Sequence, residues 1–541
     1  MHSMTPGTPN SLGISFLGAA QQHAQETALT FEGHAISYGD LARQSEGFAL
    51  ALRLHGVQPG ERVALLLPNF PHFLPAYFGM LRAGAIALPM NPTYRPPEIR
   101  HIFSDAGVTA AVVWSEILPL VQQSLDDETQ LRLIISVTLP VAEGAPSAGA
   151  SDVGTGSAKR RIEHYSFEQL LGEAATAAAQ GKAPLPADEP DQDDTAVILY
   201  TSGTTGKPKG AMLTHRNLLS NAQAVIQLAE LHPGDELMSI LPLFHSFGST
   251  VCMVAPLLAG AQVVLVPKFD PRRLLSTIQQ HNVTLLAGVP SMYALLLRTP
   301  VAAQDISSLR LCVSGGAALP GEVLRAFKDK FGIPLIEGYG LTETSPVVTF
   351  NPPKGVQKAG SIGIPLPGVE VQVHDTSGNP VPPEQIGEIV VRGPNVMKGY
   401  YHLPEATAQT IRNSWLYTGD LGYQDEDGYF FLVDRAKDLI IKGGLNVYPR
   451  ELEEVLLTHP KIAEAAVVGV GDQTKGESIK ACISPCEGVT LTKDEVIDFM
   501  RERVAPYKVP NMVEFYPLPV GLPKNATGKT LKTDLRQAKA P

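Results

Sequence analysis

The stretch Tyr200-Thr-Ser-Gly-Thr-Thr-Gly-Lys-Pro-Lys-Gly210 is the most informative part of the sequence. An apolar run, Ala196–Leu199, precedes it and predicts a buried strand that ends at this loop. The loop brings hydroxyl groups, backbone N–H groups and cationic side chains into one small volume. Because glycine lets the backbone approach an anion closely, such a loop suits a polyphosphate. On composition alone, a flexible surface turn is the more common explanation of a Gly/Ser/Thr cluster.

The loop is not a Walker P-loop, which requires the pattern G-x-x-x-x-G-K-[ST]. Gly203 and Gly206 stand too close together, and Lys207 is followed by proline. The run Gly528-Lys529-Thr530 resembles the end of that pattern, but Pro523 stands where its first glycine would have to be. Ordinary P-loop kinase or GTPase chemistry is therefore disfavoured.

The bulk properties indicate a multidomain protein. A chain of 541 residues exceeds a single hydrophobic core, so we expect at least two domains. A formal net charge of −11 disfavours a nucleic-acid binder. The 4 cysteines are scattered, and Cys482 and Cys486 lack a second Cys/His pair that would complete a zinc site. We expect all of them to be reduced, as in a cytosolic protein.

Targeting signals are not evident in the sequence. No lysine or arginine precedes Arg43, so a secretory n-region is missing. The best candidate for a membrane span, Val251–Ala261, is too short and contains proline and glycine. We therefore expect a soluble, cytoplasmic protein. A peripheral membrane contact for collecting a substrate and a homodimer are both compatible with the sequence.

Buried-strand patterns alternate with amphipathic helices over the first half of the chain, for example strand Arg62–Leu67, helix Phe73–Ala83 and strand Ala85–Pro89. This alternation predicts an α/β fold with parallel sheets and right-handed crossovers. Alternating strands at Val369–Val373 and Gly387–Arg392 add a smaller β region, and the segment beyond it predicts a small α+β domain.

Residues 141–193 change character, with low complexity at first and then an excess of Ala, Pro and Asp. Such segments bury too little apolar surface to offset their ordering entropy. We expect a flexible, solvent-exposed excursion just before the glycine-rich loop, in which the Ala-rich residues 173–179 are compatible with a short helix.

The run Ile336-Glu-Gly-Tyr-Gly-Leu-Thr-Glu343 joins a strand end to an aromatic, a hydroxyl and a carboxylate. Tyr339 can stack on a base, Thr342 can donate to a phosphate, and Glu343 can hold a hard cation through oxygen. A carboxylate facing a polyphosphate would be repulsive without a metal, so the pairing implies Mg²⁺. The alternative is an exposed Thr-Glu pair that opens a helix.

Further polar residues stand at predicted strand ends. Asp420, on a glycine-flanked turn, can accept both ribose hydroxyl hydrogens, although Asp also favours turns for its own sake. The turn Ser314-Gly-Gly-Ala-Ala318 is either a nucleotide wall or a tight strand-to-helix turn that needs glycine. His245 opens an apolar helix, where a histidine is more often a satisfied core residue than a catalyst.

These motifs resemble, in order, the signatures of the adenylate-forming superfamily, which includes acyl-CoA synthetases, aryl-CoA ligases, peptide-synthetase adenylation domains and luciferases. The resemblance covers Thr27 to Arg536 and is strongest to bacterial medium- and long-chain fatty acid–CoA ligases. It implies a large N-terminal adenylation domain (1–434) of stacked βαβ sheets plus a β region. A hinge (435–438) and a small, mobile α+β C-terminal domain (439–541) would follow.

The resemblance also assigns roles to residues. Catalysis falls to Lys529, His245, Thr342 and Glu343, with a metal at Glu343 and Thr205, and with Lys437 as the hinge. Gly443 and Gly444 would line a CoA tunnel once the small domain has turned. The residues implied in ATP or AMP binding are Thr201, Ser202, Gly203, Thr204, Thr205, Gly206, Lys209, Gly315, Gly316, Ala317, Gly338, Tyr339, Gly340, Thr342, Asp420, Arg435 and Lys529.

The implied reaction uses ATP, Mg²⁺ and coenzyme A. A carboxylic acid, expected to be a fatty acid, is converted to an acyl-adenylate and then to a thioester, with release of pyrophosphate and AMP. Ser246–Val254 holds no carboxylate that could pair with an amino-acid ammonium group. The alternatives are an aryl acid as substrate, a carrier protein as acceptor, and a nucleotide sensor without turnover, which the presence of Lys529 and Glu343 opposes.

Overall fold

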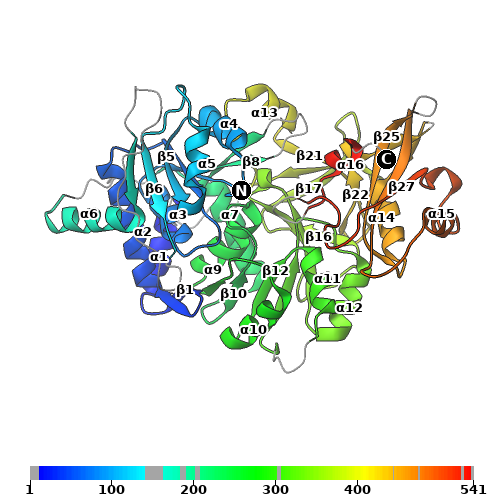
Figure 1. Cartoon of the computed structure of the whole chain (residues 1–541), viewed down its shortest axis with the longest axis horizontal. Helices are drawn as coiled ribbons and strands as arrows, with labels where there is room; N and C mark the ends of the chain where they lie inside the picture. The colour runs from blue at the N-terminus through cyan, green and yellow to red at the C-terminus, as the bar shows by residue number, and fades with distance from the viewer. Residues whose placement is uncertain are drawn as a thin grey trace.

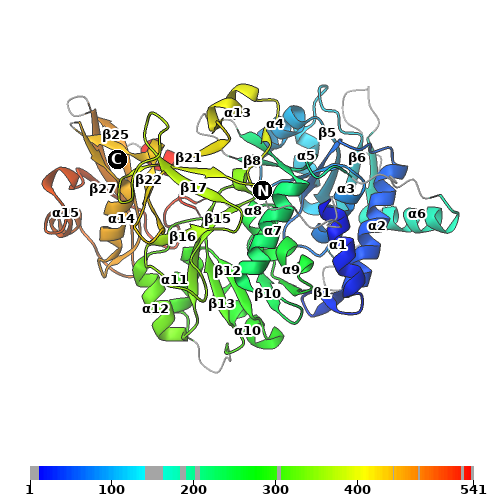
Figure 2. The same cartoon turned by 180° about the vertical axis from the view of Figure 1, so that it is seen from behind.

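The computed structural model describes residues 11–139, 162–182, 190–201, 208–300, 306–442, 444–472, 476–524 and 529–537. Within these residues the chain forms two large sheets of an N-terminal domain and a smaller sheet of a C-terminal domain. The small domain, drawn in orange, lies at one end of the molecule in both views (Figures 1 and 2). The predicted α/β class, with a large domain followed by a small one, is confirmed.

The first sheet is parallel from β4 to β7 and ends in an antiparallel edge. Its strands are, in spatial order, β19 (Gly399–Tyr400), β9 (Lys209–Thr214), β8 (Thr195–Thr201), β4 (Ile86–Pro89), β3 (Arg62–Leu66), β5 (Val108–Trp114), β6 (Leu133–Val137) and β7 (Glu163–Ser166). β8 runs parallel to β4 and antiparallel to β9, so the glycine-rich loop connects the two strands of a hairpin.

The second sheet joins a parallel half to an antiparallel half, and the predicted β region is hydrogen-bonded onto it. The parallel half contains β1 (Thr27–Phe31), β11 (Gln262–Leu265), β10 (Glu236–Ser239), β12 (Leu285–Gly288), β13 (Leu311–Ser314) and β14 (Leu335–Gly340), with β2 (His34–Ser37) antiparallel at its edge. The antiparallel half contains β15 (Val347–Phe350), β16 (Ser361–Pro365), β22 (Phe430–Arg435), β21 (Trp415–Gln424), β18 (Gly387–Arg392) and β17 (Glu370–His374), and β20 (Ile411–Arg412) pairs with β21.

Helices cover both faces of the two sheets, as near-continuous apolar strands require. Along β3, Val63 and Leu65 face a core shared with the second sheet, whereas Ala64 and Leu66 face the opposite core. The helices of the large domain are α1 (Leu12–Gln22), α2 (Tyr38–Leu54), α3 (Phe73–Arg82), α4 (Pro96–Ala106), α5 (Leu118–Ser124), α6 (Phe167–Ala179), α7 (His215–Ala229), α8 (Ser246–Ser249), α9 (Ala255–Leu258), α10 (Pro271–His281), α11 (Pro290–Arg298), α12 (Gly321–Phe331) and α13 (Pro404–Thr410), with short helical turns at η1 (Ser115–Ile117), η2 (Thr250–Val254) and η3 (Thr342–Thr344).

The small domain begins after η4 (Ala436–Asp438), where the chain leaves the large sheet. Its own sheet has the strands β24 (Leu445–Val447), β23 (Ile440–Lys442), β26 (Gly476–Pro485), β25 (Ile462–Asp472) and β27 (Met512–Phe515). Its helices are α14 (Pro449–Leu457), α15 (Lys493–Arg501), the turn η5 (Pro506–Lys508) and α16 (Lys532–Gln537). None of the helices in the described ranges is both long and apolar enough to cross a lipid bilayer.

Residues 162–182 correct the prediction for the segment 141–193. They form β7, at the edge of the first sheet, and α6, which packs on α2. Phe167 is 1% exposed and its ring stacks on Phe48 with the centroids 4.9 Å apart. The expectation of an exposed excursion is therefore wrong for these residues, and the predicted helix at 173–179 is the second half of α6. Residues 140–161 and 183–189 lie outside the described ranges.

Truncation of Phe167 should show that α6 is part of the folded domain. We expect Phe167→Ala to lower the free energy of unfolding of the N-terminal domain by about 3–5 kcal/mol, because it deletes a buried aromatic ring. Urea unfolding followed by circular dichroism measures the change. Thr176→Ala, on the exposed face of the same helix, is the control and should change stability by less than about 0.5 kcal/mol. Equal stability of both variants would contradict the assignment.

Candidate active site

A cavity of about 1020 Å³ opens between the two large sheets and the small domain. Most of the predicted site residues line it, although they come from distant parts of the chain. The residues that line it are Thr201, Lys209, His245, Gly315, Gly316, Ala317, Gly338, Tyr339, Gly340, Thr342, Glu343, Asp420, Arg435, Lys437 and Lys529. Ser202, Gly203, Thr204, Thr205, Gly206 and Gly443 lie outside the described residues. Gly444 forms the exposed turn before β24 and is not among the lining residues.

Strand ends explain why these residues meet. The carboxyl ends of parallel strands gather at one edge of a sheet, and β8, β13 and β14 all end at this cavity. Two of the glycines have a steric reason to be there. A Cβ on Gly340 would lie 1.9 Å from the Pro346 carbonyl oxygen, and Gly316 has a φ of +77°. The turns therefore need glycine for their own backbone, whatever else these residues contact.

One end of the cavity holds a polar triad of Tyr339, Asp420 and Arg435. The antiparallel register of β21 and β22 pairs Asp420 with Arg435, and the Arg435 Nε atom lies 3.2 Å from Asp420 Oδ1. The Tyr339 hydroxyl donates to Asp420 Oδ2 at 2.7 Å. Burial, and then the neighbouring Asp420 charge, raise the pKa of Tyr339, so it remains a donor. The triad fixes a buried carboxylate that can still accept from a ligand's hydroxyl groups.

Four side chains lie close together beside the two strands that the glycine-rich loop connects. They are Thr201, Lys209, Glu343 and Tyr400. The Tyr400 hydroxyl donates to Glu343 Oε1 at 2.9 Å, and the Thr201 hydroxyl lies 3.5 Å from the same oxygen. The Lys209 ammonium lies 5.1 Å from the centre of the Tyr400 ring, within cation–π range. A carboxylate and a lysine therefore face the loop together, with an aromatic ring between them.

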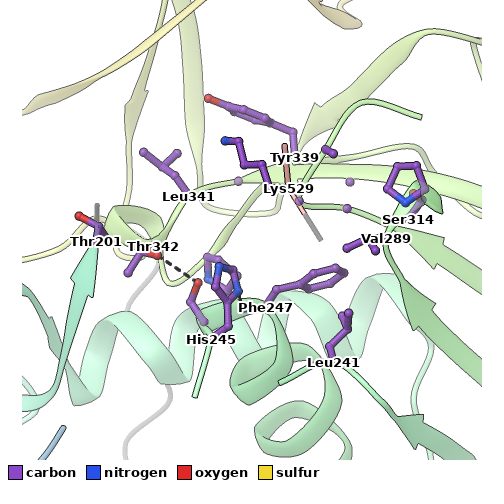
Figure 3. Close-up of a pocket in the computed structure, with 18 of the residues that line it drawn as sticks. Thr201, Leu241, His245, Phe247, Val289, Ser314, Tyr339, Leu341, Thr342 and Lys529 are labelled. Atoms are coloured by element: carbon purple, nitrogen blue, oxygen red, sulfur yellow. Dashed lines mark hydrogen bonds between the residues drawn. The ribbon is translucent and has the colours of Figure 1, made fainter. Parts of the chain in front are cut away.

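Lys529 and His245 approach each other across the cavity. Figure 3 shows Lys529 beside Tyr339, with His245 and Phe247 on the facing side. Burial lowers the pKa of Lys529 to about 8, and the neighbouring Arg435 charge acts in the same direction. Burial, and then Lys529, lower the pKa of His245 to about 4. His245 is thus neutral near pH 7, and its Nδ1 accepts from the Phe247 N–H at 3.2 Å.

An apolar arm continues the cavity below His245 and Phe247. Its side chains come from α7, from β10, from β12 and from the segments that follow α7 and β10. The apolar residues of this arm are Val225, Leu228, Leu231, Leu237, Leu241, Val251 and Leu285. A predominantly apolar arm that meets a polar, charged chamber is suited to a ligand with a long apolar body and one reactive polar end.

The described residues contain no group of three or more His, Cys, Asp or Glu side chains that could hold a metal by themselves. The Glu343 carboxylate lies beside Thr201, and Tyr400 orients one of its oxygens. Mg²⁺ commonly needs only one or two carboxylates, because substrate phosphates supply further oxygen ligands. The residues present therefore fit a magnesium ion that is shared with a polyphosphate.

Two residues important to the site were not predicted from the sequence. Tyr400 donates to Glu343 and faces Lys209, and no sequence motif pointed to it. Tyr200, at the start of the loop, donates its hydroxyl to Asp105 of α4 at 2.5 Å and so ties the loop to a helix 95 residues away. The aromatic identity of both residues was visible, but their partners lie far away in the sequence.

Comparison with known proteins places the chain among enzymes that bind nucleotides. A family model described as "AMP-binding enzyme" matches residues 16–401, and one described as "AMP-binding enzyme C-terminal domain" matches residues 451–529. A long-chain-fatty-acid–CoA ligase of Bacillus subtilis (strain 168) is 38% identical over 537 residues, which are 97% of this chain and 94% of that protein. A feruloyl-CoA synthase of an Amycolatopsis species is 37% identical, over 96% of this chain and 97% of the relative.

Solved structures agree with these matches. ATP-bound MatB from Rhodopseudomonas palustris matches with a TM-score of 0.85 at 32% identity, and the match covers 98% of this chain and 99% of that one. The apo form of the same protein covers the same shares at the same identity, but its TM-score is 0.74. The present structure is therefore more similar to the ATP-bound structure of MatB than to the apo structure.

Asp420 and Lys529 should contribute to nucleotide binding in different ways. If Asp420 accepts from a ribose, Asp420→Ala should lower the affinities for adenosine, AMP and ATP by a similar factor of about tenfold or more. If Lys529 contacts the phosphates, Lys529→Ala should lower the affinity for ATP and leave the affinity for adenosine almost unchanged. Isothermal titration calorimetry with the three ligands measures both effects. Glu370→Ala, which breaks a surface ion pair with Arg392, is the control. Unchanged adenosine affinity in Asp420→Ala would exclude the ribose role.

Proposed function

The chain belongs to the AMP-binding enzyme family, as an AMP-forming acyl-CoA ligase, and from this premise we propose that it joins a medium- or long-chain fatty acid to coenzyme A. ATP would supply the energy, through an acyl-adenylate that is formed with release of pyrophosphate and consumed with release of AMP. One observation carries the proposal. Lys529 of the small domain enters the same cavity as Asp420, Glu343 and His245 of the large domain.

The first half-reaction requires two anions to react with each other. A carboxylate oxygen must attack the α-phosphorus of ATP while pyrophosphate leaves, so the site must supply positive charge and alignment. Lys529, buried beside Arg435, provides that charge at the centre of the cavity. Tyr339, Asp420 and Arg435 would hold the ribose and so fix the nucleotide against the acid.

Glu343 is the residue that would hold Mg²⁺, and the ion would neutralise phosphate charge when bound. Tyr400 keeps the Glu343 carboxylate turned toward the loop. Lys209 faces the same loop and would contact the phosphates from the other side of the Tyr400 ring. Because His245 is neutral, it would not form an ion pair with the carboxylate of the acid. Its imidazole ring would instead position that carboxylate.

The second half-reaction requires a route for the thiol of coenzyme A. We propose that the small domain turns about Lys437, which withdraws Lys529 and brings the turn at Gly443 and Gly444 to the cavity. The thiol would then attack the acyl carbonyl carbon, and AMP would leave with the bonding electron pair. The covalent connection through η4 allows this turn, because one short segment joins the two sheets.

Two features support a fatty acid over an aryl acid. The apolar arm is lined by side chains from α7, β10 and β12, among them Val225, Leu237 and Leu285, which suits a ligand with a long apolar body. A relative named for long-chain fatty acids is also 38% identical over nearly the whole chain. The aryl alternative is favoured by the feruloyl-CoA synthase, which is almost as similar. The experiment below separates the two.

A panel of acids with ATP, Mg²⁺ and CoA tests the proposal directly. We expect mass spectrometry to detect acyl-CoA and AMP, with kcat/KM rising by about fourfold for each added CH₂, since burial of one CH₂ contributes about 0.8 kcal/mol. The rise should stop where the chain reaches the end of the arm at Leu231 and Leu237. Leu237→Trp should shorten the preferred acid while leaving the KM for ATP unchanged. Formation of ADP, or a preference for ferulate-like acids over all fatty acids, would contradict the proposal.

The Lys529 charge predicts a pH dependence. Its pKa is lowered from 10.5 to about 8 in the free enzyme, so the cation that the phosphates need is present below pH 8 and is lost above it. We therefore expect kcat/KM for ATP, measured by pyrophosphate release, to fall about tenfold per pH unit above pH 8. The guanidinium of Lys529→Arg stays charged, so the residual kcat/KM of this variant for ATP should not decline above pH 8. An identical decline in that variant would assign the pH effect to another group.

A further inference from the structure

Arg450, at the start of α14, connects the two domains across the hinge. Its Nη1 atom donates to the carbonyl oxygen of Leu432 at 2.7 Å, and its backbone N–H donates to Asp434 Oδ2 at 2.9 Å. Leu432 and Asp434 belong to β22 and precede η4, whereas Arg450 follows it. In both views α14 lies beside β22 at the junction of the domains (Figures 1 and 2).

The guanidinium is well ordered by its surroundings. Its side chain is 12% exposed, and Glu454, one turn along α14, accepts from Nε at 2.9 Å. The buried carboxyl group of Glu337, on β14 of the large domain, lies close enough for the Arg450 charge to act on its pKa, and it accepts from the Leu319 N–H at 3.0 Å. Asp434 also faces the start of α14, where the helix dipole favours a carboxylate.

These contacts cannot survive a domain rotation. A hydrogen bond of 2.7 Å weakens steeply once its atoms separate by an additional ångström. A turn about Lys437 that removes Lys529 from the cavity must move Arg450 relative to Leu432, because the two residues lie on opposite sides of the hinge. The bond is present in the arrangement that places Lys529 in the cavity, and such a turn would break it.

We propose that Arg450 is a positioning residue, whose guanidinium latches the small domain onto β22 in the arrangement that forms the acyl-adenylate and releases it for the thioester step. The catalytic consequence of the latch rests on the proposed function. The effect of the latch on the arrangement of the two domains is independent of that function. Arg450 itself touches neither nucleotide nor acid, since it is not among the residues that line the cavity.

Chemical reactivity of Lys529 tests the latch without any turnover. Lys529 is buried in the latched arrangement, so its reductive methylation in the full-length protein, followed by peptide mass spectrometry, should be slow. We expect Arg450→Ala to increase that rate about fivefold or more, the scale of a typical coupling between two states. Arg450→Lys keeps the charge but cannot donate to Leu432 and Glu454 in the same geometry. Its rate of Lys529 methylation should lie between the rates of the wild type and of Arg450→Ala. An unchanged rate in Arg450→Ala would overturn the proposal.

The two half-reactions provide the second readout. In Arg450→Ala, single-turnover pyrophosphate release should fall about fivefold or more, while thioester formation from supplied acyl-adenylate and CoA should be unchanged or faster. Arg503→Ala is the matched control, because the Arg503 guanidinium bonds to Phe499 and Glu502, which both belong to the small domain. An equal loss in both half-reactions would show a merely structural role and overturn the latch. If the wild type forms no acyl-adenylate but Lys529 reactivity still responds to Arg450→Ala, the proposed function fails and the latch stands.

Discussion

The structure depends on the concentration of positive charge that it assembles at the domain junction. Lys529, Arg435 and Lys437 all line one cavity, and burial beside Arg435 already lowers the pKa of Lys529. Asp420 offsets part of this charge, but it is also bonded to Tyr339 and Arg435. An additional anion would relieve the remaining repulsion. We therefore propose that a triphosphate would stabilise the arrangement in which Lys529 lies in the cavity, and that this arrangement would supply the charge that the chemistry needs.

The sequence predicted the fold where local patterns and packing agree. The buried runs predicted at Arg62–Leu67 and Ala85–Pro89 form the parallel strands β3 and β4, because both of their faces pack into apolar cores. Helix α2 begins at Tyr38 with Ser37 as its N-cap, although Asp40 is also a suitable capping residue. The Ser37 hydroxyl accepts from the Asp40 N–H, so Asp40 occupies the first turn. Both residues are good caps, and the sequence alone does not decide between them.

The prediction failed for residues 162–182 because it treated residues 141–193 as one exposed segment on the basis of average composition. That segment is not uniform in composition. Its middle carries a capping box, formed by Ser166 and Gln169, and a buried Phe167. These few residues stabilise a strand and a helix between stretches of low complexity.

The candidate site shows what local sequence patterns do not reveal. Its motif residues could be found from their order along the chain, but Tyr400 and Asp105 act through partners more than 50 residues away, and only the folded sheets show those pairs.

The anchoring of α16 explains how a domain movement can be transmitted to one ammonium group. Lys529 lies just before this helix, and the buried ammonium of Lys480, on β26, donates to the Leu535 carbonyl oxygen at its end at 2.9 Å. Leu535 packs against Leu522 and Val468, and Lys532 pairs with Glu453 of α14. Each of these contacts lies within the small domain, so α16 moves as part of that domain. Any force that turns α14 away from β22 therefore also moves Lys529 relative to the nucleotide, and the charge follows the hinge.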